Sequence, residues 1–120
     1  MNNCLSVKNV LNSERTIFAE ALSKRFNYDS IRFVLVSLTE AMKNKSIITS
    51  LKRDSDLLIN EEPLKINNED VFVLTLFKTD TINAYKFLNR LELLTDVTNH
   101  YISDEKESLE DSIRKFCSTY

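Results

Sequence analysis

The side chains of this chain that could do nucleophilic chemistry are few and far apart. It has one histidine, His100, and two cysteines, Cys4 and Cys117. A cysteine nucleophile needs a neighbouring base, so Cys117 with His100 is the pair to consider. Cys117, however, falls on an apolar stripe, where cysteine behaves as a small buried hydrophobe. His100 lies near an expected helix end, where histidine interacts with terminal carbonyl groups. We therefore expect no catalytic residue in this pair.

Metal and cofactor sites find no support in the spacing of possible ligands. The two cysteines stand at opposite ends of the chain, without the spacing of a zinc site, and in a reducing compartment we expect free thiols. The run Asp54-Ser55-Asp56 opens like an EF-hand loop, but Leu58, Ile59 and Lys65 stand where that loop needs a ligand, a glycine and a glutamate. The acidic residues fall mainly where loops and helix starts carry solvated charge. We expect no metal and no cofactor.

The chain contains no glycine at all, where average usage near 7% predicts about eight. Glycine supplies backbone at positive φ and lets the main chain approach a ligand closely. Its absence excludes the Walker loop, the dinucleotide-binding fingerprint and the nucleophile elbow. Tight hairpins that use Asn-Gly or Gly-X are excluded as well. The sequence therefore predicts a protein that is not an enzyme.

Length and composition are those of one ordinary globular domain. With 120 residues, 42% of them hydrophobic and 28% charged, a single domain over 1–120 with its own core is expected. The net charge of −2 gives no general attraction to nucleic acid or anionic membrane. The start lacks the apolar stretch of a signal peptide, and the longest apolar runs fall short of the roughly 20 residues of a membrane span. We expect an intracellular protein, cytoplasmic or nuclear, with a composition typical of an AT-rich genome such as that of a virus or phage.

Apolar periodicity predicts a mainly α-helical fold of about five or six helices. The first helix is expected after a cap at Asn12 or Ser13, with Ile17, Phe18 and neighbouring apolar residues on its buried stripe. The second is expected over 30–45. Because this segment is apolar nearly all round, it should be the central and most buried element.

The remaining segments follow the same logic with two ambiguities. Residues 46–60 suit a short helix or a small β-hairpin, and residues 70–78 suit a helix or a buried strand. A loop is expected over 60–68, around the proline. A long helix is expected over 82–101, and a last helix is expected to run from a capping box at 104–107 to the end of the chain. Without glycine caps, helices should end at polar pairs such as Asn44-Lys45 and Asn99-His100.

One functional alternative is nucleic-acid binding. In the order of its elements, the segment 12–60 resembles a winged-helix domain, with a helix-turn-helix followed by a hairpin wing. Phosphate contacts would then come from Lys24, Arg25, Arg32, Lys43, Lys45, Lys52 and Arg53. Against this, the recognition helix would carry few side chains able to read base edges, and the wing would have to turn without glycine.

The favoured hypothesis is a non-enzymatic protein-protein interaction domain, with a regulatory or assembly role and a partner that is another protein or a second copy of the chain. A compact domain without a catalytic constellation acts most often by presenting a surface, anchored by aromatic and leucine side chains. Tyrosine combines an apolar ring with a polar tip. The interface candidates are therefore Tyr28, Tyr85, Tyr101 and Tyr120.

In size, composition and expected helical content the chain also resembles virus-encoded Bcl-2-like proteins. That resemblance implies a groove that binds a helix of a host protein. The Asn-Trp-Gly-Arg type signature of the cellular members needs tryptophan and glycine, and the chain has neither. No functional residue is carried over from that family.

Overall fold

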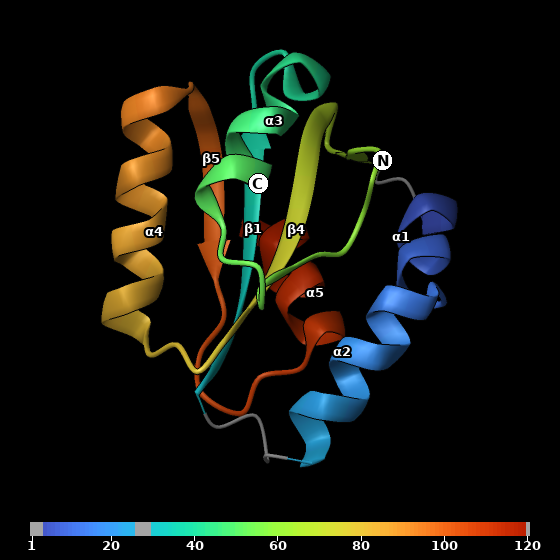
Figure 1. The fold of residues 1–120 in the computed structure, drawn as a ribbon. Helices are drawn as coiled ribbons and strands as arrows, with labels where there is room; N and C mark the ends of the chain where they lie inside the picture. Colours follow the sequence, from blue (N-terminus) through green and yellow to red (C-terminus); the bar gives the residue numbers. More distant parts are fainter. Residues whose placement is uncertain (1–3, 26–29, 120) are drawn as a thin grey trace.

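The computed structural model of the chain describes residues 4–25 and 30–119 as an α/β protein built around one antiparallel sheet (Figure 1). The helices are α1 (Cys4–Leu11), α2 (Glu14–Arg25), α3 (Ala41–Leu51), α4 (Thr81–Leu94) and α5 (Leu109–Thr119). The strands are β1 (Ile31–Leu38), β2 (Leu57–Leu58), β3 (Leu64–Ile66), β4 (Glu69–Phe77) and β5 (Val97–Ile102). The expected mainly α-helical fold, an all-α helical bundle, is therefore wrong.

The strands are connected as two interleaved β-α-β units. The sheet order is β2-β4-β1-β5, and β3 also pairs with β4. Strand β1 is antiparallel to β4 and to β5, and β2 is antiparallel to β4, so β1 runs parallel to β2 and β4 runs parallel to β5. Each of the units β1-α3-β2 and β4-α4-β5 has its two parallel strands separated by a strand of the other unit. This is the split β-α-β, or ferredoxin-like, topology.

Helices cover both faces of the sheet. Helices α3 and α4 pack on one face, over a cluster that includes Val34, Leu74 and Leu88. Helix α5 covers the opposite face together with α1 and α2, over a cluster that includes Phe33 and Phe116. Figure 1 shows α5 behind the sheet, with α1 and α2 along one side. The sheet is thus the middle of three layers.

Strand β1 is the segment that the apolar pattern assigned to a helix. All eight of its residues are buried, and alternate side chains enter opposite clusters, with Val34 and Val36 on one face and Phe33 and Leu35 on the other. A strand buried on both faces has a continuous apolar run, which periodicity cannot distinguish from a buried helix. The helix expected over 30–45 is therefore wrong over Ile31–Leu38, where the strong burial is as expected, whereas residues 41–45 are helical but mostly not buried.

The region after β1 also differs from expectation. Helix α3 runs through the Asn44-Lys45 pair that was expected to end a helix, and it continues to Leu51. The hairpin considered for 46–60 does not form, because the short strand β2 pairs with β4 instead. Within the expected loop over 60–68, residues Leu64–Ile66 form a strand that also pairs with β4. The ambiguous segment 70–78 is largely strand β4.

The long helix expected over 82–101 is two elements. Helix α4 begins after Asp80, whose carboxylate accepts a hydrogen bond from the backbone N–H of Asn83 at 2.8 Å. It ends at Leu94, and Val97–Ile102 forms strand β5 along β1. Asn99-His100 therefore lies inside a strand. Pairing with β1 outweighs the weak helix preference of this stretch, as tertiary context regularly does.

Several polar residues at turns have positive φ, the conformation that glycine adopts most readily. Six non-glycine residues have positive φ in the described part of the chain: Ser30, Glu40, Asn67, Asn68, Lys78 and Lys106. Asn67 and Asn68, with φ of 51° and 67°, join β3 to β4 as a two-residue hairpin. Asparagine enters this region more readily than most residues. A tight hairpin therefore forms at this turn with an Asn-Asn pair, without the Asn-Gly or Gly-X sequences that the chain lacks.

The helices at the two ends of the chain agree better with expectation. Ser13 caps α2, since its Oγ accepts a hydrogen bond from the backbone N–H of Thr16 at 3.2 Å. The buried face of α2 differs from the predicted stripe, because Ile17 and Phe18 are 59% and 57% exposed. The last helix, α5, begins at Leu109, later than the expected capping box.

Glu107 anchors α5 to the sheet. Its side chain is 5% exposed and its Oε2 lies 2.5 Å from Nζ of Lys115. Its Oε1 accepts hydrogen bonds from Oη of Tyr101 at 2.7 Å, from the N–H of Asp104 at 3.1 Å and from Oγ of Ser112 at 3.3 Å. Burial alone raises the pKa of Glu107, but the hydrogen bonds from Lys115, Tyr101 and Asp104 outweigh it and hold that pKa below its ordinary value. The carboxylate therefore stays charged where it joins strand, loop and helix.

We predict that Glu107→Gln lowers the free energy of unfolding at pH 7 by about 1–3 kcal/mol, because buried partners lose a charged acceptor. A lowered folded-state pKa gives stability that is complete above the unfolded value, about 4.3, and is lost as the pH falls through the folded-state pKa. The difference in free energy of unfolding between wild type and variant, measured by urea denaturation, should therefore become smaller as the pH is lowered from 7 toward 3. Glu105→Gln, on the same loop but exposed, is the control and should leave stability nearly unchanged.

Candidate functional site

A basic pocket lies between the loop after α3 and one face of α4. The pocket has a volume of about 190 Å³, and four cationic side chains line it: Arg53, Lys78, Lys86 and Arg90. Its apolar lining comes from Leu51, Leu76 and Phe87. The remaining lining residues are polar or acidic: Asp56, Thr79 and Asn83. The pocket therefore joins side chains from three separate parts of the chain.

Helix α4 supplies one wall of the pocket by its regular spacing. Asn83, Lys86, Phe87 and Arg90 are separated by three, four and seven positions, which places them on one helical face. Phe87 is buried in the cluster between helix and sheet, while Lys86 and Arg90 are exposed. The cap at Asp80 fixes where the helix begins, and so it fixes which residues face the pocket.

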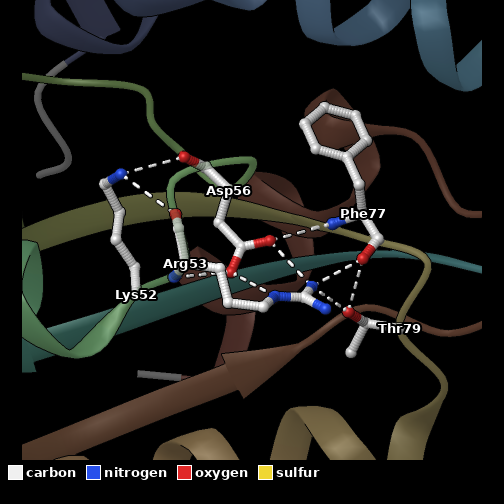
Figure 2. Close-up of polar contacts among 5 residues, drawn as sticks. All are labelled: Lys52, Arg53, Asp56, Phe77 and Thr79. Atoms are coloured by element: carbon white, nitrogen blue, oxygen red, sulfur yellow. Dashed lines mark hydrogen bonds and ion pairs between the residues drawn. The ribbon is translucent and has the colours of Figure 1, made fainter.

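The opposite wall is held by a bidentate ion pair between Arg53 and Asp56 (Figure 2). Nη2 of Arg53 donates to Oδ1 of Asp56 at 2.8 Å, and Nε donates to Oδ2 at 2.9 Å. Nη2 also donates to the carbonyl oxygen of Phe77 at 2.6 Å and to Oγ1 of Thr79 at 2.8 Å. The hydrogen bond that Arg53 donates to Asp56 raises the pKa of the Arg53 guanidinium. Arg53 is thus fixed against the end of β4.

The carboxylate of Asp56 is buried and accepts several hydrogen bonds from the protein. Its side chain is 2% exposed, and its carboxylate also accepts hydrogen bonds from the backbone N–H groups of Arg53 at 3.1 Å and Phe77 at 3.3 Å. The ammonium of Lys52 donates to the carbonyl oxygens of Arg53 and Asp56 at 3.3 and 3.0 Å, which ties the same loop together (Figure 2). The one acid that lines the pocket is therefore committed to holding the loop.

The charges around the pocket are strongly unbalanced. Four cations and one carboxylate give +4 − 1 = +3, although the whole chain has a net charge of −2. Lys78, Lys86 and Arg90 have no ion-pair partner within residues 4–25 and 30–119, whereas cations such as Lys45 and Lys65 are paired with Glu61 and Asp70. A cluster of unpaired cations with apolar walls attracts an anionic group.

An apolar hollow adjoins the basic pocket along the seam between α3 and α4. Its volume is about 240 Å³ and its lining includes Ile47, Leu51 and Leu94. Leu51 lines both hollows. Leu94 follows Arg90 by one helical turn and is 59% exposed. We call the two hollows together the α3–α4 groove, basic at one end and apolar at the other.

Other hollows in the described residues have a different character. One carries Arg32 among the acids Asp80, Asp104 and Glu105. Another includes Arg15 and Lys45, both paired with Glu61. Within residues 4–25 and 30–119, no group of three or more His, Cys, Asp or Glu side chains could hold a metal ion.

The cations predicted for nucleic-acid binding do not form one surface. Lys24 and Arg25 lie at the end of α2. Lys43 pairs with Glu40, Lys45 pairs with Glu61, and Lys52 bonds to carbonyl groups of its own loop. Arg32 is 3% exposed and donates to Thr81 and to the carbonyl oxygen of Ile31. Among these seven residues, Arg53 alone lines the basic pocket. The expected recognition helix is strand β1, so the winged-helix arrangement over 12–60 is not formed.

The tyrosine candidates are also separated. Tyr85 on α4 is 45% exposed and contacts His100 edge to face, with ring centroids 6.4 Å apart. Tyr101 is half-buried against the second cluster and donates to Glu107; burial raises its pKa, and so does the hydrogen bond to Glu107. Cys117 packs against that same cluster, on the face of the sheet opposite to α4. Tyr28 and Tyr120 lie outside the described residues.

Lys78, Lys86 and Arg90 were missed by sequence reasoning. The helical spacing of Asn83, Lys86 and Arg90 was visible in the sequence, but nothing there placed these side chains opposite Arg53, more than 25 residues earlier in the chain. Arg53 meets the residues of α4 because β2, which follows the Arg53 loop, pairs with the last part of β4, and α4 begins shortly after β4.

Comparison with known proteins adds no family assignment, because no protein-family model, curated protein or solved structure matches the chain. Among the described residues, none of the helices has the length and apolar character that crossing a membrane requires. The geometry of the α3–α4 groove therefore carries the functional argument.

We predict that Asp56→Asn lowers the free energy of unfolding by about 1–3 kcal/mol and loosens the loop at Arg53, because it removes a buried charged acceptor. Hydrogen exchange of the backbone N–H groups of Arg53 and Phe77, which donate to Asp56, should accelerate. Asp54→Asn changes an exposed acid of the same loop and serves as the matched control. Equal exchange rates in both variants would contradict the role assigned to Asp56.

Proposed function

We propose that this protein is a non-enzymatic protein-protein interaction domain whose partner presents an acidic segment, followed by an apolar side chain, to the α3–α4 groove. The single observation that carries the proposal is the excess of three positive charges at one end of the groove, next to an apolar hollow at the other. Complementary charge sets orientation and specificity, and a desolvated apolar anchor supplies affinity.

The size of the basic pocket favours a protein segment over nucleic acid. Nucleic-acid binding depends on many phosphate contacts spread along a backbone, whereas the unpaired cations gather around a volume of about 190 Å³. The cations of the earlier alternative are largely paired or lie on other elements. A compact basic end with an apolar neighbour suits one or two acidic side chains of a peptide.

A second candidate function is self-association through β5 and α4. Among the described strands, β5 is at the edge of the sheet and pairs with β1 alone, and such an edge is a template for another strand. Beside it, Ile82, Tyr85 and Leu93 on α4 are 68%, 45% and 85% exposed. A two-fold axis beside β5 would pair the β5 strands of two copies and bring their exposed apolar residues of α4 together.

The α3–α4 groove predicts a defined selection from a random peptide display library. Selected peptides should be enriched in Asp or Glu next to Leu, Ile or Phe. Their affinity should fall at least about tenfold, or about 1.4 kcal/mol, in the Lys86→Glu/Arg90→Glu variant when measured by fluorescence anisotropy. Leu94→Ser should weaken binding without changing its salt dependence.

The matched control is Lys24→Glu/Lys106→Glu, which changes the net charge equally at exposed residues that do not line the pocket. This variant should bind the selected peptides like the wild type. Selection of peptides without acidic enrichment, or equal loss in both double variants, would reject the proposed function.

The self-association candidate predicts a concentration-dependent dimer in sedimentation velocity. Ile82→Lys/Leu93→Lys should shift the protein to a monomer, because charge would be buried in an apolar contact. Met42→Lys changes a residue of α3 that is 57% exposed and should leave the dimer intact. A wild-type protein that stays monomeric at the highest soluble concentration would remove this candidate.

A further inference from the structure

We infer that the basic pocket binds a phosphate monoester dianion, so that the partner segment is recognised in a phosphorylated form. The inference rests on the proposed function, which places a partner segment in the α3–α4 groove, and it specifies the chemical group that enters the basic end.

Arg53 is positioned before any ligand arrives. Three fixed acceptors, on Asp56, Phe77 and Thr79, hold its Nη2, and Asp56 also holds its Nε. Within the described residues Nη1 has no hydrogen-bond partner, and the side chain remains 54% exposed. The N–H₂ group at Nη1 can therefore donate a charge-assisted hydrogen bond to a phosphate oxygen. Because its orientation is already fixed, little side-chain entropy is lost on binding.

The charge balance favours a dianion over a carboxylate. The pocket carries an excess of three positive charges, so a single carboxylate leaves two of them uncompensated, whereas a phosphate monoester with a charge near −2 at pH 7 compensates two. Lys78 from the β4–α4 loop and Lys86 and Arg90 from α4 line the same pocket as Arg53. The N–H groups of these cations can donate to the three terminal oxygens of a phosphate monoester, whereas a carboxylate offers two oxygens.

No acid in the pocket competes for these cations. Asp56 is the one carboxylate in its lining, and all its hydrogen bonds go to Arg53 and to Phe77. The nearby carboxylate of Asp80 accepts from the first turn of α4. The amide of Asn83 adds a neutral donor to the lining. The pocket thus presents several cationic donors, and the one carboxylate in its lining is already bonded to Arg53 and Phe77.

The test is a titration of the ¹⁵N-labelled full chain followed by NMR, with probes that separate the possible sources of phosphate. The probes are inorganic phosphate, a capped peptide Ala-Ala-phosphoserine-Ala-Ala, the same peptide with aspartate, adenosine monophosphate and acetate, all at one ionic strength. We expect saturable shifts at Arg53, Lys78, Asn83, Lys86 and Arg90. The phosphopeptide should bind at least about tenfold more tightly than the aspartate peptide.

Charge-neutralising variants test whether phosphopeptide binding depends on the cations of the pocket. Lys86→Gln/Arg90→Gln should lose at least about tenfold in phosphopeptide affinity, whereas Lys24→Gln/Lys106→Gln, with the same charge change outside the pocket, should not. Lys86→Arg keeps the charge and should retain binding. Unchanged spectra away from the pocket report that each variant is folded.

Three outcomes overturn the inference: shifts that do not saturate, equal affinity for phosphoserine and aspartate peptides, or equal loss in both double variants. Tighter binding of adenosine monophosphate than of the phosphopeptide would assign the pocket to a nucleotide and would also overturn it. If the pocket does not bind phosphate but the groove still selects acidic-apolar peptides, the inference is rejected and the proposed function is retained. Phosphate binding without selection of any such peptide would reject the proposed function instead.

Discussion

The rest of the structure depends on the pairing of β1 on both of its edges while both of its faces are buried. β4 lies along one edge and β5 along the other, and β1 side chains enter both hydrophobic clusters. This position fixes the order of the sheet. It requires each β-α-β unit to pass over a strand of the other, which puts α3 and α4 side by side on one face. The second face is left for α1, α2 and α5, and buried Glu107 links α5 to β5 through Tyr101.

The α3–α4 groove is a consequence of this arrangement. The two helices meet over the same sheet face, and the chain between them passes through the Arg53 loop and along β4. Asp56 joins that loop to the end of β4 through Phe77 and Arg53. The same contacts stabilise the loop and fix Arg53 in the lining of the pocket, so the recognition that we propose would depend on the carboxylate that also holds the loop. In that proposal Asp56 is a positioning residue, and Lys86 and Arg90 contact the ligand.

Sequence patterns identified some elements well and others poorly, for reasons visible in particular residues. Ser13 as a helix cap and the amphipathic last helix were correct because local hydrogen bonding and one-sided burial leave local signals. The segment 31–38 was assigned to a helix because burial on both faces removes the alternation that marks a strand. The stretch 97–102 was joined to the preceding helix because its strand conformation depends on β1. Of the pocket, Arg53 was named for another function, and the cations of α4 were not named at all.

By itself the sequence determined the limits of the chemistry: without glycine there is no phosphate loop of the Walker type, and one histidine with two distant cysteines offers no ordinary metal cluster. It also predicted a strongly buried element over 30–45, which Ile31–Leu38 bears out, and it left 70–78 open between a helix and a buried strand. Tertiary structure decided whether those buried runs were helices or strands, because backbone pairing between distant segments supplies the hydrogen bonds. It also decided where the charges meet. A basic pocket built from residues 53 to 90 exists because two helices and a strand end converge, and convergence in space leaves no local pattern in a chain.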